Sequence, residues 1–158
     1  MGVSTDAIIA YGIAIPEDAT LPWSDYEDEE DWWCDTQGFR PTIESPFTEE
    51  GEWKEGDLGE LEKQSEARYK ERQDWLAAHP MPVEVVHHCS GEYPMFVLAM
   101  PGSVQTAWRG SPVHLDTMPP KPTEETDRFF EVVLDFCKGF GIDTGNEIPG
   151  WLLFSYWG

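Results

Sequence analysis

The run "AIIAYGIAIP", residues 7 to 16, decides the fold. It is almost continuously apolar and ends at a proline, a pattern typical of a strand that is buried on both faces. We therefore expect it to be a central strand of a sheet, with the rest of the chain arranged around it.

Two helices are expected further along the chain. Residues 57 to 79, "DLGELEKQSEARYKERQDWLAAH", are dominated by straight-chain helix formers with a thin apolar stripe, which predicts a mostly exposed helix that ends before Pro80. Thr123 is a good N-cap for a second helix, whose apolar residues recur at helical spacing up to Phe140. Gly139 or Gly141 can terminate this second helix.

Further strands are indicated by short β-branched and apolar runs. "PVEVVHHCS" (82 to 90) and "PMFVLAM" (94 to 100) predict a hairpin, because only "GEY" separates them. Residues 103 to 115 can supply one or two short edge strands, and "GWLLFSYWG" (150 to 158) a last strand.

These elements predict an α+β fold, a two-layer sandwich with a mixed or mainly antiparallel sheet of about five strands and two helices. A length of 158 residues suits a single domain over 1–158. Residues 17–56 form an acidic, aromatic-rich insertion within it, in which we expect little regular structure because prolines and glycines recur. A long loop of this kind is usually functional or disordered.

Charge is the outlying property of the chain. There are 31 acidic and 10 basic residues, a net −21, and Glu17 to Glu62 alone hold 17 acidic and 2 basic residues, a net −15. Nucleic acid and anionic membranes attract Lys and Arg, so we expect no direct nucleic-acid binding and no membrane binding. The charge favours a basic protein partner that is reached by electrostatic steering.

Three cysteines, Cys34, Cys89 and Cys137, are an odd number without paired spacing. This argues against a secreted disulfide framework and favours a reducing cytoplasm. The N-terminal region has no basic stretch before an apolar core, and no apolar run approaches the roughly 20 residues of a membrane span. We therefore expect neither a signal peptide nor a membrane segment.

The segments "GVSTDAIIAYGI", "HHCSGEYPMFVLAMPG", "AWRGSP" and "GWLLFSYWG" resemble a group of small uncharacterised proteins of tailed bacteriophages. The similarity covers roughly a third of the chain and excludes the acidic insertion. It implies a phage product made in the bacterial host cytoplasm that acts on host or phage machinery, and it implies no reaction. Many small acidic phage proteins block host nucleases, polymerases or defence complexes by occupying basic nucleic-acid grooves, which agrees with the charge.

The stretch "WSDYEDEEDWWCD", residues 23 to 35, is the expected partner-binding surface, because it holds seven carboxylates and three tryptophans. Dense carboxylates on a rigid surface can imitate the phosphates of a duplex, and aromatic side chains anchor either a loop or an interface. The alternative is a solvated acidic loop without a partner. The expected binding residues are Asp25, Glu27, Asp28, Glu29, Glu30, Asp31, Trp32, Trp33 and Asp35.

Metal and catalytic sites are not expected. The acidic stretch lacks the glycine and the bidentate glutamate of a calcium-binding EF-hand, since Glu30 and Thr36 occupy those positions when Asp25 is the first. On a strand, His87 and Cys89 lie on one face and His88 on the other, so at most two of them converge. The spacing fits no four-ligand zinc site, and we expect no cofactor.

We therefore expect a binding protein and not an enzyme: an acidic phage protein that inhibits a host nucleic-acid-handling or defence protein, with nucleic-acid mimicry as its sharpest form. One alternative is a phage structural, assembly or complex-accessory protein. Another is a small enzyme or metal site around His87 and Cys89, to which Arg109, His114 and Asp116 could contribute. The aromatic terminal strand, if exposed, would offer the edge for a homodimer.

Overall fold

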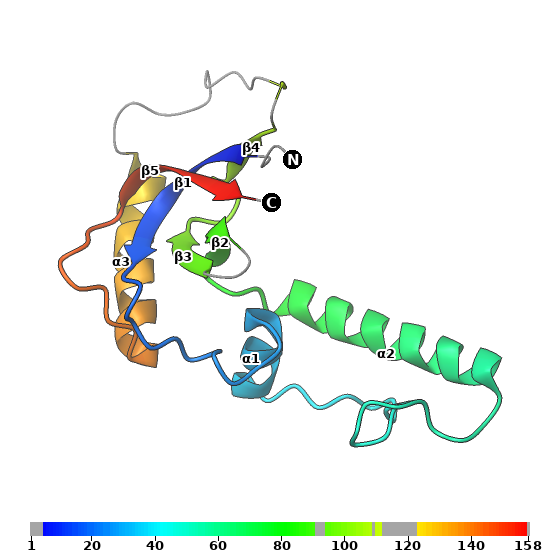
Figure 1. The fold of residues 1–158 in the computed structure, drawn as a ribbon. Coiled ribbons are helices and arrows are strands. Elements are labelled where there is room, and N and C mark those ends of the chain that lie inside the picture. Colours follow the sequence, from blue (N-terminus) through cyan, green and yellow to red (C-terminus); the bar gives the residue numbers. More distant parts are fainter. Residues whose placement is uncertain (1–4, 91–93, 109, 112–122, 158) are drawn as a thin grey trace. The chain divides into compact units, whose positions relative to one another are not determined.

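The computed structural model describes residues 5–90, 94–108, 110–111 and 123–157. The elements of the described residues are β1 (Thr5–Ile15), α1 (Glu29–Thr36), α2 (Leu58–Ala78), β2 (Glu84–Ser90), β3 (Pro94–Ala99), β4 (Gln105–Ala107), α3 (Glu124–Phe140) and β5 (Gly150–Trp157) (Figure 1). The predicted α+β class is confirmed. The described residues form three helices and not two.

The chain divides into two compact units. The sheet unit comprises residues 1–25 and 82–158 and contains every strand of the sheet. The acidic unit comprises residues 26–81 and contains α1 and α2. Residues 26–81 include 17 acidic and 6 basic residues, a net −11, so the acidic unit holds about half of the charge in about a third of the chain.

The sheet is mixed and mainly antiparallel, with strand order β3-β2-β5-β1-β4 and a further pairing of β1 with β3. β5 lines one edge of β1, while β4 and β3 follow each other along its other edge. β2 and β3 form the predicted hairpin. β2 also pairs in parallel with the end of β5, so that β1, β3, β2 and β5 close a ring of four strands.

Gly12 lies where β1 is paired on both sides, opposite Ala99 in β3 and Gly150 in β5. A Cβ atom at this position would lie 2.3 Å from the carbonyl oxygen of Leu98. The close approach of two backbones requires glycine here, which is a common reason for a glycine within a strand.

α3 packs on the sheet through its apolar face, as its spacing predicts. Thr123 caps the helix, and its side chain accepts a hydrogen bond from the backbone N–H of Thr126. Phe129, whose ring centroid is 6.2 Å from that of Tyr11 in β1, is buried with Val133, Phe136 and Cys137. Gly141 ends the helix with a left-handed φ of 69°.

The acidic unit is built on α2. Asp57 caps its N-terminus and accepts a hydrogen bond from the backbone N–H of Glu60, and no residue of the helix is buried. This confirms the mostly exposed helix expected over residues 57 to 79. The expectation of little regular structure before it was wrong for residues 29 to 36, which form α1. Within the described residues, no helix combines the length and apolar character needed to cross a bilayer.

Candidate functional site

α1 begins inside the acidic stretch because that stretch supplies a cap and a favourable first turn. The side chain of Asp28 accepts a hydrogen bond from the backbone N–H of Asp31, 2.7 Å away. Glu29, Glu30 and Asp31 then occupy the first turn, where carboxylates interact favourably with the helix dipole. The run of charge is therefore the N-terminus of a helix.

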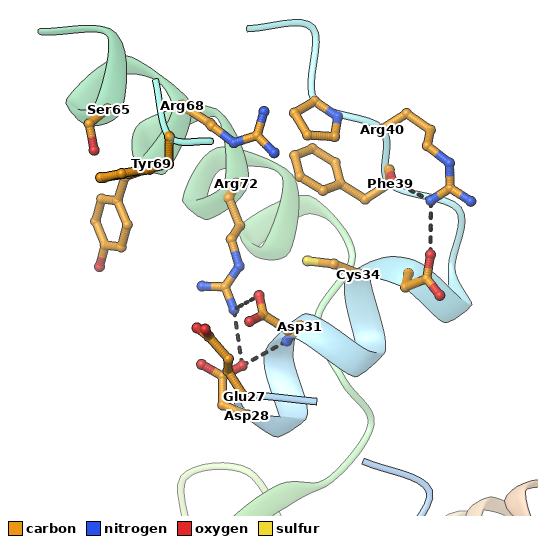
Figure 2. Close-up of a pocket in the computed structure, with 13 residues that line it drawn as sticks. Glu27, Asp28, Asp31, Cys34, Phe39, Arg40, Ser65, Arg68, Tyr69 and Arg72 are labelled. Atoms are coloured by element: carbon orange, nitrogen blue, oxygen red, sulfur yellow. Dashed lines mark hydrogen bonds and ion pairs between the residues drawn. The ribbon is translucent and has the colours of Figure 1, made fainter. Parts of the chain in front are cut away.

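Arg72 of α2 binds the carboxylates of this first turn (Figure 2). Its guanidinium lies 3.1 Å from Asp28, 3.0 Å from Glu30 and 2.9 Å from Asp31. Its side chain is only 19% exposed. Partial burial opposes the charge on Arg72, but the three carboxylates outweigh it and raise its pKa. Three of the expected partner-binding carboxylates thus share an internal counterion.

The other expected binding residues divide between exposed and buried positions. Asp35 is exposed, pairs with Arg40 at 3.1 Å and accepts a hydrogen bond from the Tyr26 hydroxyl. Asp25 and Glu27 are exposed, and neither forms an ion pair with a described residue; Asp25 falls in the sheet unit. Glu29 is half-buried.

Trp32 and Trp33 are 4% and 8% exposed, so neither supplies the exposed tryptophan that the expected contact surface requires. The indole N–H of Trp33 donates a hydrogen bond to the carbonyl oxygen of His79, and the two indole rings lie 5.9 Å apart. Cys34 beside them is also buried, and burial raises the pKa of its thiol. This side of α1 belongs to the packing of the protein.

The chain after α1 is held along α2. The carboxylate of Glu71 accepts hydrogen bonds from the hydroxyl of Thr42 (2.7 Å) and from the backbone N–H groups of Thr42 (2.9 Å) and Ile43 (3.3 Å). These bonds lower the pKa of Glu71. One and two turns earlier, Arg68 and Gln64 donate to the carbonyl oxygens of Ile43 and Glu44. Part of the acidic insertion is therefore fixed to a helical scaffold.

Trp53 is set in place by a tight turn. Phe47 and Trp53 form an antiparallel bridge with ring centroids 4.5 Å apart, and the backbone N–H of Thr48 donates to the carbonyl oxygen of Glu52 at 2.7 Å. Gly51, with a φ of 83°, allows the turn. The segment "TEEGE" thereby presents three glutamates next to an indole ring.

A groove of about 380 Å³ lies between this turn and α2 and is lined by Trp53, Glu62, Ser65, Glu66 and Tyr69; we call it the acidic aromatic groove. Its aromatic residues are exposed, Trp53 to 41% and Tyr69 to 64%. The glutamates in and near it are exposed, and none of them forms an ion pair with a described residue: Glu49, Glu50, Glu52, Glu55, Glu62 and Glu66. Six uncompensated glutamates of the acidic unit thus either line this groove or lie within four residues of Trp53 in the sequence.

Glu62 closes the acidic range from Glu17 that was expected to meet a basic partner, whereas Glu66, Trp53 and Tyr69 were not expected to bind one. A signal was present in the sequence. Glu62, Glu66 and Tyr69 follow one another at helical spacing, so they share one face of α2. Trp53, which lies outside that helix, could be placed on the same face only by the fold of the turn.

A larger pocket of about 600 Å³ lies in the acidic unit and contains three arginines (Figure 2). Each guanidinium already has a partner. Arg40 binds Asp35, Arg68 donates to the carbonyl oxygen of Ile43, and Arg72 binds the first turn of α1. The arginines are therefore engaged internally and give the pocket little attraction for an anion.

The side chain of Cys89 in β2 is not placed as a regular strand predicts. His87 is exposed and its ring contacts Phe96, while burial lowers the pKa of His88, whose ring contacts Phe154. Cys89 was expected on the face of His87, but its φ is 69° and its Sγ atom lies 3.5 Å from Nδ1 of His88. That expectation was wrong because a left-handed residue breaks the alternation of side chains.

Other residues considered for metal binding or catalysis do not join this pair. Arg109, His114 and Asp116 lie outside the described residues. Among the described residues, no group of three or more His, Cys, Asp and Glu side chains is placed to hold a metal ion. This includes the four carboxylates considered for calcium: Asp25, Glu27, Glu29 and Asp31.

No family model, no curated protein and no solved structure matches this chain.

Proposed function

We propose that this protein binds a basic protein through the acidic unit, and that it thereby inhibits a host protein that handles nucleic acid or serves in defence against phage. The observation that carries the proposal is the acidic aromatic groove, where uncompensated glutamates surround two exposed aromatic side chains. Lys and Arg side chains of a partner are attracted by such a surface and can stack on Trp53 and Tyr69.

Order in the acidic insertion supports the proposal. An acidic segment that is ordered only on binding would lose conformational entropy at that step. Here Glu71 holds the segment around Thr42, and Arg72 holds α1, on the same helix that carries the groove. Part of the backbone that carries the carboxylates is thus held in place, which favours an imitation of nucleic acid.

Inhibition by occlusion is the mechanism that follows from this surface. A protein that binds nucleic acid exposes Lys and Arg residues that bind phosphates. The glutamates near the groove would form ion pairs with those Lys and Arg residues, and the aromatic rings would add contact area from which water is excluded. Nucleic acid would then compete with this protein for the same groove of the partner.

Charge reversal in the groove tests the proposal. Wild type, Glu62→Lys/Glu66→Lys and the control Glu124→Lys/Glu125→Lys are each used to capture proteins from a bacterial lysate at low and at high salt, with identification by mass spectrometry. The control makes the same change of charge on exposed residues of the sheet unit. We expect wild type and the control variant to capture a basic protein at low salt, and the groove variant not to capture it. High salt should release this partner from wild type.

A second arm tests inhibition. The captured partner is purified and its binding to duplex DNA or RNA is measured with increasing amounts of this protein. Competition that the groove variant no longer exerts would support the proposal. A partner that binds equally well at high salt, or one that the control variant loses and the groove variant keeps, would contradict it.

Neutralising Asp28 to Asp31 is a less informative test, although these residues were expected to bind the partner. Removing their charge would leave Arg72 without its counterions and destabilise α1. Lost binding would then report lost structure, and Glu27→Gln is a cleaner change in that stretch because Glu27 is exposed and forms no ion pair with a described residue.

A further inference from the structure

Two sulfur atoms and one imidazole nitrogen, all possible metal ligands, lie close together where β2 and β3 pair. His88 of β2 lies opposite Met95 of β3, and Cys89 is the next residue of β2. The Sγ atom of Cys89 lies 3.1 Å from Sδ of Met95 and 3.5 Å from Nδ1 of His88. All three side chains are partly buried.

The backbone of Cys89 brings the donors together. Cys89 is the only residue other than glycine with a positive φ among the described residues, at 69°. A non-glycine residue in this region carries a strain of about 1 kcal/mol or more, and such strain is concentrated at functional sites. In a regular strand, neighbouring side chains point to opposite faces, so without this conformation the thiol would lie away from His88.

The chemistry of the three donors selects a particular kind of ion. Zinc and the hard cations are bound by His, Cys and carboxylate groups, and no three of these groups are assembled among the described residues. Here the third donor is a thioether. Thiolate and thioether sulfur favour Cu(I), and imidazole also binds copper. We propose that Cys89, Met95 and His88 form a binding site for a soft monovalent metal ion, Cu(I).

The spacing of the donors is close to what one ion requires. Sulfur and nitrogen ligands lie about 2.3 and 2.0 Å from a bound ion such as zinc, so three donors around one ion are about 4 Å apart. The two distances from the Sγ atom of Cys89 therefore need to lengthen by about 1 Å or less. Binding would release the thiol proton of Cys89 to solvent.

Contacts from a third strand hold the site. The ring of His88 packs 5.0 Å from that of Phe154 in β5, and Cys89 pairs with Tyr156 of the same strand. These contacts limit the movement of two of the donors, and preorganised donors bind a metal more tightly. The site lies in the sheet unit, and it does not depend on the proposed function of the acidic unit. It also departs from the sequence-based expectation of no metal, which assumed regular alternation along β2.

Competition for Cu(I) under anaerobic conditions tests the site. The full chain is titrated against the Cu(I) complex of the chromophoric chelator bicinchoninate. The variants are Cys89→Gly, Met95→Leu and the control Met100→Leu, which changes another methionine near β3. Cys89→Gly should fold well, because glycine adopts a positive φ without strain.

We expect wild type and Met100→Leu to withdraw one equivalent of Cu(I). Cys89→Gly and Met95→Leu should each lower the affinity for Cu(I) by at least about tenfold. Loss of a residue that only supports a metal ligand already costs about that much, and loss of a ligand itself should cost no less. X-ray absorption of the complex should show two sulfur ligands and one nitrogen ligand. The proposed site would be overturned if Cys89→Gly bound Cu(I) as tightly as wild type. It would also be overturned if Met95→Leu did so, because the thioether would then have no role in binding.

Discussion

The indole N–H of Trp33 in α1 donates a hydrogen bond to the backbone carbonyl oxygen of His79, 2.8 Å away, at the C-terminal end of α2. The last carbonyl groups of a helix have no partner within it, and this bond satisfies one of them. The ring of His79 stacks on Trp75 at 4.3 Å, and Trp75 contacts Phe39 at 5.2 Å. An aromatic cluster thus joins the two helices of the acidic unit.

Replacing Trp33 by Phe should destabilise the acidic unit by about 1 to 2 kcal/mol, because a part-buried carbonyl oxygen loses its donor. Urea unfolding followed by circular dichroism measures the change. Trp53→Phe is the matched control, since Trp53 is 41% exposed, and its effect on stability should stay below about 0.5 kcal/mol. The two variants should affect partner binding in the opposite order: Trp53→Phe should weaken binding more than Trp33→Phe does. Equal stability of the two variants would contradict the role given to Trp33.

Replacing Arg72 by Met should lower the free energy of unfolding by about 2 kcal/mol, because three carboxylates lose their counterion. This value lies between those for exposed and for buried ion pairs, since the Arg72 side chain is only 19% exposed. Arg128→Met is the control, because its pair with Glu124 spans 3.8 Å and its side chain is 81% exposed. The control should change stability by less than about 0.5 kcal/mol. Thermal and urea unfolding measure both, and an Arg72 variant as stable as the control would show that the first turn of α1 needs no counterion.

The carboxyl group of Glu71 should titrate below the usual value of 4.5, because Thr42 donates two hydrogen bonds to its charged form. Its pKa is lowered in the folded state, so the stabilisation is complete above 4.5 and is lost as the pH falls through the lowered pKa. Carbon-detected NMR titration measures the pKa. In Thr42→Val, which keeps the backbone N–H and removes the hydroxyl, the pKa should move back toward 4.5. An unchanged pKa in that variant would exclude the hydroxyl as a cause.

Replacing Gly12 by Ala should destabilise the sheet unit by about 3 kcal/mol or more, because the new Cβ would lie 2.3 Å from the carbonyl oxygen of Leu98. Gly139→Ala is the opposite case. Gly139 lies in α3, and its Cβ position has no neighbouring atom within 4 Å, so alanine should stabilise the helix by up to about 1 kcal/mol. Denaturant unfolding measures the free energy of unfolding of both variants. A change of the same sign in the two would contradict the close packing described at Gly12.

The elements with strong local signals could be predicted from the sequence. Residues 7 to 16 form most of β1, because burial on both faces leaves an uninterrupted apolar run. The capping residues Asp57 and Thr123 begin α2 and α3 as expected, and Gly141 ends α3. These signals are local, since each depends on a few neighbouring residues.

α1 was not predicted, although Asp28 and the acidic first turn are a recognisable helix start. The recurring prolines and glycines of residues 17–56 predicted irregular structure instead. Their pairing with Arg72 connects residues more than 40 positions apart, and no local pattern shows such a contact. For the same reason, the glutamates near Trp53 and Tyr69 that lack an ion pair with a described residue could not be distinguished from the paired carboxylates before the fold was known.

The conformation of Cys89 also escaped prediction. Strand periodicity assigns side chains to faces on the assumption that every residue is extended. One left-handed residue reverses the assignment, and nothing in "VVHHCS" marks it, because left-handed backbone is usually occupied by glycine or asparagine. The cluster with His88 and Met95 therefore emerges only from the three-dimensional structure.

The pairing of β1 with β5 has a consequence for synthesis on the ribosome. β1 leaves the ribosome before every other element of the described residues, but one whole edge of it stays unpaired until residues 150 to 157 have been made. The contacts that define the acidic unit, by contrast, lie between residues 26 and 81, so that unit has its complete sequence much earlier. Proteolysis of stalled nascent chains that end near residue 120, long enough for the whole acidic unit to have left the ribosome, should therefore find α2 protected and β1 cleaved. Until the ring of strands closes, the apolar stretch around Ile8 and Ile13 is a surface on which a chaperone can act.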